Sequence, residues 1–339
     1  MSRTDRLLAD VERGFTSLEQ GRLDDATASL ERCQRIDRKN PDVIALAAAV
    51  ATAKGEADVA LGLYSQLIEI SPDDPMPRIC VARIELHDKQ DPESALETVA
   101  EALELVDDED DLLQAVLVRA EASLMLDRQA DAREALAELA SSMIDDPELA
   151  LDIAELAIAA EDPVVATRWI EIARKAESGD YEADTLHLLG RVHELTGDRA
   201  EMIAAWRKVR ALDAEAAAGP VEVSVDELER IASATLAELP ADVRAHLDRV
   251  PILIDDLPSD DLLADGLDPR LLGLFQGASL PEGGGLAPTV TNILLFKKNL
   301  ERVAHDLDHL AEEIRITVLH ETAHYFGLDE DELEAIGLD

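Results

Sequence analysis

Apolar residues recur along the first two thirds of the chain at steps of 34 to 37 residues. Each unit contains three such residues, of which the first is most often alanine and the other two follow four and seven positions later. This spacing places all three on one face of a helix. The triplets are Ala26, Leu30, Cys33; Ala60, Tyr64, Leu67; Ala95, Val99, Ala102; Ala132, Leu136, Leu139; Ala166, Ile170, Ala173; and Met202, Trp206, Val209. This period predicts stacked helix pairs, with Cys33 and Trp206 as core residues.

Glycine stands at the expected turns within three pairs, at Gly21, Gly55 and Gly197. The helical pattern breaks down after Trp206, and Gly219-Pro220 stops any helix. We therefore predict a repeat array in residues 1–215, a linker in 216–224 and a second domain in 225–339.

The second domain is predicted to be α+β. Short β-branched runs at 250–256 and 289–296 indicate strands, and the stretch 258–288 between them indicates a loop with at most a short helix. A helix is expected from about Ser224 to Leu239 and a short one around 299–304. Asp306 is expected to cap a long helix through Phe326, because apolar residues recur there at steps of three and four. The fold class is thus mostly α, a helical solenoid followed by a small α+β domain.

The composition of the chain argues mainly against certain classes of binding partner. Lys and Arg number 31 against 74 Asp and Glu, a net charge of −43, so neither nucleic acid nor an anionic membrane is an expected partner. The two cysteines are too far apart and too few for a disulfide framework or a cysteine zinc cluster. Neither a signal-peptide pattern nor a long apolar span is seen, so a cytoplasmic protein is expected.

The repeats resemble the tetratricopeptide-repeat (TPR) family. Leu189-Gly190, twelve residues before Met202, matches the first-helix signature of that family, although the family's tryptophan is absent from that helix and two units carry insertions. The resemblance implies a superhelix whose concave groove binds a peptide or protein. The alternative is an array that only spaces or caps the other domain.

The end of the chain carries the motif of clearest chemical meaning, His320-Glu321-Thr322-Ala323-His324. Histidines four apart on a helix point to the same side, and two imidazoles can share one Zn²⁺ at about 2.0–2.1 Å. Glu321 is turned by about 100° from His320, which suits the general base for an attacking water. The motif predicts His320 and His324 as metal ligands and Glu321 as the catalytic base.

Gly327 and an acidic cluster extend the motif to H-E-x-x-H-x-x-G-x-x-[acid]. With the GLFQG segment upstream, the C-terminal domain resembles the minimal zincin-type, metzincin-like metallopeptidase domains. The resemblance implies a zinc peptidase with Glu330 as third ligand; Asp331 and Asp329 stay open, because the family usually has aspartate there. The strand at 289–296 is expected to be the rim that pairs with an extended substrate.

Two functions remain in competition. One is a zinc-dependent peptidase whose repeats recruit a protein substrate or regulator. The other is a non-catalytic repeat adaptor whose zincin-type domain is a structural or vestigial metal module. A second histidine pair, His305 and His309, is interpreted as exposed helix residues.

Overall fold

The computed structural model describes residues 3–175, 180–216, 219, 221–239, 241, 250–276 and 292–325. Contacts between Cα atoms divide the chain into two compact units, Met1–Glu177 and Ser178–Asp339. The last predicted helix pair therefore falls in the second unit, and the predicted domain boundary at 216–224 stays a prediction about the sequence.

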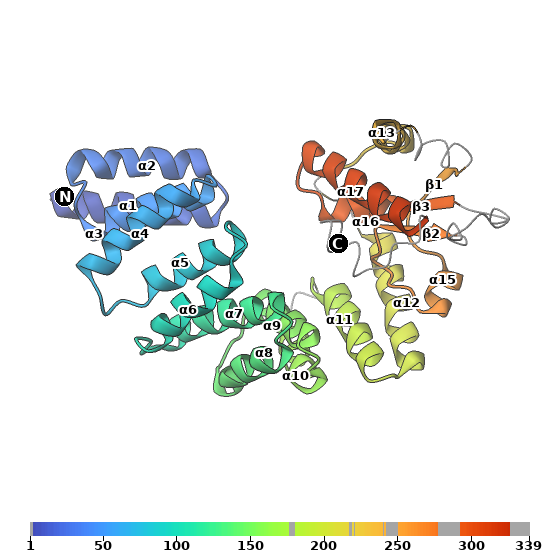
Figure 1. The fold of residues 1–339 in the computed structure, drawn as a ribbon, viewed down its shortest axis with the longest axis horizontal. Coiled ribbons are helices and arrows are strands. Elements are labelled where there is room, and N and C mark those ends of the chain that lie inside the picture. Colours follow the sequence, from blue (N-terminus) through green and yellow to red (C-terminus); the bar gives the residue numbers. More distant parts are fainter. Residues whose placement is uncertain are drawn as a thin grey trace. The chain divides into compact units, whose positions relative to one another are not determined.

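The first unit is a succession of helix pairs joined by short turns (Figure 1). Its helices are α1 (Arg3–Glu19), α2 (Leu23–Ile36), α3 (Pro41–Ala53), α4 (Ala57–Ile70), α5 (Met76–His87), α6 (Pro92–Leu103), α7 (Glu109–Met125), α8 (Gln129–Ala137), α9 (Pro147–Ala159) and α10 (Pro163–Ala173). A 3-10 turn, η1 (Glu138–Ser141), extends α8. Asn40 and Asp146 cap α3 and α9 and precede a proline at the first helical position, which explains where these helices begin.

The repeating triplets form the core of the array. All of their residues are at most 9% exposed. Three successive apolar clusters join α1–α2 to α3, α3–α4 to α5, and α5–α6 to α7. Each of these three pairs thus buries its apolar face against the first helix of the next pair, and the predicted solenoid is confirmed.

The backbone repeats with the same period as the triplets. The residue five positions before each triplet adopts a left-handed conformation, with φ between 53° and 76°. These residues are Gly21, Gly55, Gln90, Asp127, Glu161 and Gly197. Six units are therefore visible in the turn geometry, including three in which the sequence has no glycine to mark the turn.

The second unit combines helices with a three-stranded sheet. The helices are α11 (Glu182–Leu195), α12 (Arg199–Glu215), α13 (Val225–Glu238), α15 (Asp260–Asp265), α16 (Lys297–Val303) and α17 (Leu307–Tyr325), and the strands are β1 (Ile252–Asp255), β2 (Gly273–Gln276) and β3 (Asn292–Phe296). The strand order is β1-β3-β2, with β1 parallel and β2 antiparallel to β3.

Helices α13 and α17 share the core of this unit with the sheet (Figure 1). Leu310, Ile314 and Val318 of α17 are fully buried in one cluster with Ile293 and Leu295 of β3. The apolar residues that recur at steps of three and four along α17 thus form the face of the helix that packs in the core. The predicted α+β fold is confirmed.

The structure corrects two expectations for the sheet. The predicted rim strand at 289–296 contains β3, whose described part is central and paired on both sides. The segment GLFQ, expected within a loop with at most a short helix, is strand β2. Its antiparallel pairing with β3 outweighs a local composition that has little β-branched character and a flanking glycine.

Within the described residues, no helix is both long enough and apolar enough to cross a membrane.

Candidate metal centre

Helix α17 presents the histidine motif in its last two turns. Asp306 fixes the start of the helix, because its carboxylate accepts the backbone N–H of His309 at 2.8 Å. The buried row of α17 anchors the middle of the helix to the sheet. The motif residues 320–324 therefore stand on a rigid element, as a ligand site requires.

His320 and His324 converge as the sequence predicts. Their Nε2 atoms are 3.0 Å apart, and the ring centroids are 4.6 Å apart with the planes nearly perpendicular. Two nitrogens that bind one tetrahedral Zn²⁺ at about 2.05 Å lie about 3.3 Å apart. The spacing of the two Nε2 atoms is therefore close to the spacing of two ligands on one zinc ion.

Glu321 lies on the buried side of α17, facing β2. The residue is only 6% exposed, and its Oε2 accepts the backbone N–H of Phe275. Gly273 permits this close approach, because a Cβ there would lie 2.5 Å from Thr317 Cγ2 and 3.2 Å from Glu321 Cγ. The carboxylate is thus held at a fixed place between helix and strand.

Among the strands that the structure describes, β2 is an edge strand, and it lies beside this carboxylate. The N–H of Phe296 donates to the carbonyl of Leu272, and the register pairs Leu274 with Leu294. Bonded and non-bonded pairs alternate along an antiparallel ladder, so Gly273 and Phe275 direct their backbone groups away from β3. The bond from Phe275 to Glu321 lies on this outer edge.

The remaining predicted ligands lie outside the described residues. These are Glu330 and its alternatives Asp331 and Asp329. Among the described residues, no group of three His, Cys, Asp or Glu side chains is placed to hold a metal. The described part therefore supplies two converging imidazoles, and the third ligand stays a prediction.

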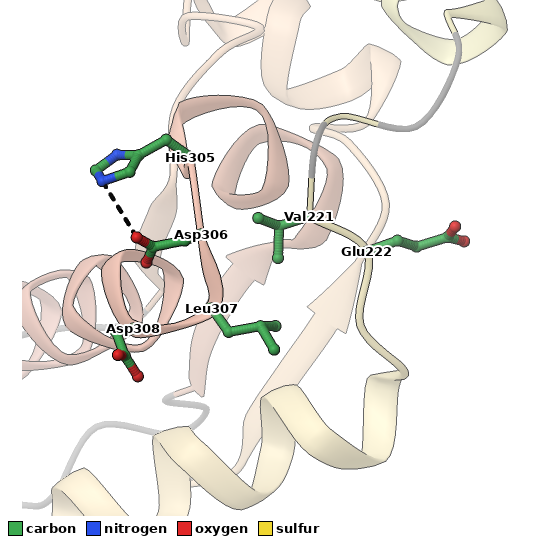
Figure 2. Close-up of a pocket in the computed structure, with 6 residues that line it drawn as sticks. All are labelled: Val221, Glu222, His305, Asp306, Leu307 and Asp308. Carbon is green, nitrogen blue, oxygen red and sulfur yellow. Dashed lines mark ion pairs between the residues drawn. The ribbon is translucent and has the colours of Figure 1, made fainter. Parts of the chain in front are cut away.

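The second histidine pair is separate from the motif. His305 borders a pocket at the start of α17, its side chain is 72% exposed, and its Nε2 lies 3.5 Å from Asp306 Oδ2. Glu222 and Asp308, which also line this pocket, point away from that pair (Figure 2). His309 is half-buried, with Nε2 3.2 Å from Glu313 Oε1, and precedes His320 by about 16 Å of helix. The His305 and His309 rings lie side by side with centroids 4.1 Å apart, but their Nε2 atoms face different carboxylates. The expectation of two exposed helix residues is wrong in part, because His305 precedes α17 and His309 is half-buried.

Sequence reasoning missed Gly273 and Phe275 as neighbours of Glu321. In the sequence, the GLFQG segment contributes only to the resemblance to the zincin-type domains. The available indication is a glycine beside a short apolar run, which is compatible with a strand that another element approaches closely.

Comparisons with known proteins agree with this architecture. A family model for zincin-like metallopeptidases matches residues 247–338, and a tetratricopeptide-repeat model matches residues 17–84. No curated protein matches the chain.

Solved structures resemble the helical array. One is PilW, a widely conserved type IV pilus biogenesis factor, with a TM-score of 0.52 and 16% identity over 62% of this chain and 94% of that chain. Another is pilF of Pseudomonas aeruginosa, with a TM-score of 0.48 and 20% identity over 63% of this chain and 95% of that chain. The first likeness shows the fold alone. The chain thus joins a tetratricopeptide-repeat array to a zincin-like metallopeptidase domain, as the sequence predicts.

Proposed function

We propose that the protein is a zinc-dependent peptidase whose repeat array recruits a protein substrate or partner. The observation that carries the proposal is the convergence of the His320 and His324 imidazoles one residue away from a buried glutamate. A zincin-like family match over the same segment supports it.

The residues of the chain have distinct roles in this proposal. His320, His324 and Glu330 would hold the ion, which supplies a Lewis acid and lowers the pKa of a bound water. Glu321 accepts the proton of the attacking water and passes it to the leaving amine. The outer edge of β2, rather than the central β3, is the edge that pairs with an extended substrate in this proposal, through the outward backbone groups of Gly273.

One observation favours the second function, a non-catalytic metal module. Glu321 already accepts the Phe275 N–H, so its carboxylate has a structural partner. Two variants separate the roles. Glu321→Gln keeps an acceptor oxygen for Phe275 but removes the base, whereas Glu321→Ala removes both.

The test combines metal content with cleavage. Full-length wild type, His320→Ala and Glu321→Gln are loaded with zinc, analysed for bound metal and incubated with fluorescein-labelled casein. His305→Ala is the matched control, because this exposed histidine lies outside the motif. The proposal expects zinc loss only in His320→Ala and loss of cleavage in both motif variants. Cleavage retained in Glu321→Gln would exclude the proposed base.

A cavity between α3 and α5 supports the recruiting role of the array. It has a volume of 270 Å³, apolar walls that include Phe15, Ala49 and Met76, and carboxylates of Asp42 and Asp74 at its border. With a net charge of −43, this combination favours a segment with one apolar side chain flanked by Lys or Arg. Peptides of this kind selected from a random library are expected to lose binding to Ala49→Trp, which fills the cavity.

A further inference from the structure

The segment that leads into β2 is held from several directions. The buried Asn299 of α16 donates from Nδ2 to the carbonyls of Pro269 and Leu271, at 2.9 and 2.7 Å. The next carbonyl, of Leu272, accepts the N–H of Phe296. The backbone of 269–272 is therefore fixed immediately before the strand that contacts Glu321.

Acidic side chains of α11 and α12 bind the same segment, residues 269–272, through Arg270. Arg270 donates from Nη1 to Asp184 of α11 at 2.6 Å and from Nε to Asp213 of α12 at 3.2 Å. Asp213 is only 5% exposed and also pairs with Arg302 of α16 at 2.7 Å. The planar guanidinium presents several N–H groups in a fixed arrangement, so one side chain bonds acceptors on two helices.

A second link runs through Asp268. His187 of α11 places Nε2 2.8 and 2.9 Å from the two carboxylate oxygens of Asp268, whose Oδ1 accepts the N–H of Arg270 at 2.7 Å. Burial acts to raise the pKa of Asp268, but the hydrogen bond and charge of His187 outweigh it and hold that pKa below its ordinary value. The charged carboxylate is therefore the form that the surroundings stabilise.

We infer that Arg270 is a positioning residue for the candidate site, through which α11 and α12 set the place of the Phe275 N–H against Glu321. Phe275 follows Arg270 by five positions, and the backbone contacts of 269–272 restrict the movement of the segment between them. In this inference the helix pair α11–α12, which is also the last repeat, helps to position the candidate site of the second unit. It lies outside the family match, which begins at residue 247.

This inference rests on the proposed role of Glu321 for its functional meaning, but its test needs no metal and no substrate. The chain has four phenylalanines, so selective [¹⁵N]Phe labelling gives a simple amide spectrum of the full-length, chelator-treated protein. Phe275 reports the bond to Glu321, Phe296 reports the β2–β3 ladder, and Phe15 of α1 reports the first unit. Glu321→Ala defines the Phe275 signal when the bond is lost.

Arg270→Gln is expected to move the Phe275 amide toward its position in Glu321→Ala, with Phe15 unchanged. Asp184→Asn, at a half-exposed partner, is the milder second variant and is expected to give a smaller shift in the same direction. Arg207→Gln is the matched control, because Arg207 joins α12 to Asp260 of α15 through an exposed 3.5 Å pair. Its spectrum is expected to equal that of the wild type.

A Phe275 amide that stays in place in both Arg270→Gln and Asp184→Asn, while Glu321→Ala moves it, overturns the inference. If Arg270→Gln also loses the Phe296 signal, the variant has disturbed the β2–β3 ladder itself. The shift of the Phe275 amide in Asp184→Asn then decides the test. Zinc content is measured on separate, metal-loaded samples. Absence of zinc there contradicts the proposed function and leaves the Phe275 result to be judged by itself.

Discussion

Replacing Gly273 by alanine tests the packing of β2 on α17. The new Cβ would lie 2.5 Å from Thr317 Cγ2 and 3.2 Å from both Glu321 Cγ and the Leu294 carbonyl oxygen. Thr317 is buried and its hydroxyl is bonded to the Glu313 carbonyl, so the clash cannot be relieved by a freely moving side chain.

The magnitude follows from two opposing effects. Inserting a methyl group into a packed contact costs about 1–3 kcal/mol, and removing a glycine from the unfolded chain returns about 0.4–1 kcal/mol. The expected net loss is about 1–2 kcal/mol. For a unit the size of Ser178–Asp339, this lowers the thermal midpoint by about 2–8 °C.

The assay separates the two units through their tryptophans. Trp169 lies in α10 of the first unit and Trp206 in α12 of the second, and both are buried. In a Trp169→Phe background, fluorescence of Trp206 follows the second unit alone. Gly62→Ala is the control of opposite sign in the first unit, followed by Trp169 in a Trp206→Phe background. This α4 glycine has nothing within 4 Å of its added Cβ, so the substitution is expected to gain about 0.5–1 kcal/mol of helix stability.

The reasoning would be refuted by a Gly273→Ala protein whose second unit unfolds at the same midpoint as the wild type or above it. Such a result would mean that β2 does not contact α17 at this glycine. The bond from Phe275 to Glu321 would then lose its geometric basis.

Three further predictions concern the turns, the thiols and Asp268. Glu161→Gly relieves a left-handed turn residue and should stabilise the first unit, whereas Gly55→Ala should destabilise it by about 1 kcal/mol; opposite shifts in denaturant midpoints check this. Burial raises the pKa of Cys33 and of Cys80, so both should react slowly with a thiol reagent at pH 7 until the chain is unfolded; rapid reaction in the native state would contradict their placement. Because its folded pKa is depressed, Asp268 stabilises the fold above its ordinary pKa of about 3.9, and this contribution is lost as pH falls through the lower folded value. The stability difference between wild type and Asp268→Asn should therefore shrink in acid; a constant difference would refute the linkage.

The helical array was predictable because its core residues are close together in the sequence. A small residue and its partners four and seven positions later define one buried face, and this needs no knowledge of distant contacts. The left-handed turns at Gln90, Asp127 and Glu161 were not predictable, since no glycine marks them and neighbouring packing enforces the conformation.

The sheet was predictable only in part. The β-branched and apolar runs predicted the strands that contain β1 and β3. The order of the strands, however, depends on pairing between segments that are distant in the sequence. Consequently the strand that contains β3 was expected at the rim and β3 is central, and the four residues of β2 were expected within a loop.

The candidate site divides in the same way. The convergence of His320 and His324 follows from helix geometry and is seen in the structure. The partner of Glu321 and the grip of Asp184 and Asp213 on Arg270 join residues far apart in the sequence, so no local pattern announces them.

The central claim is that the HExxH helix holds zinc, and elemental analysis of the full-length protein tests it most directly. The account predicts about one zinc ion per chain after metal-replete preparation, lost in His320→Ala, weakened in Glu330→Ala and unchanged in His305→Ala. A wild-type protein that retains no zinc after such preparation would contradict it.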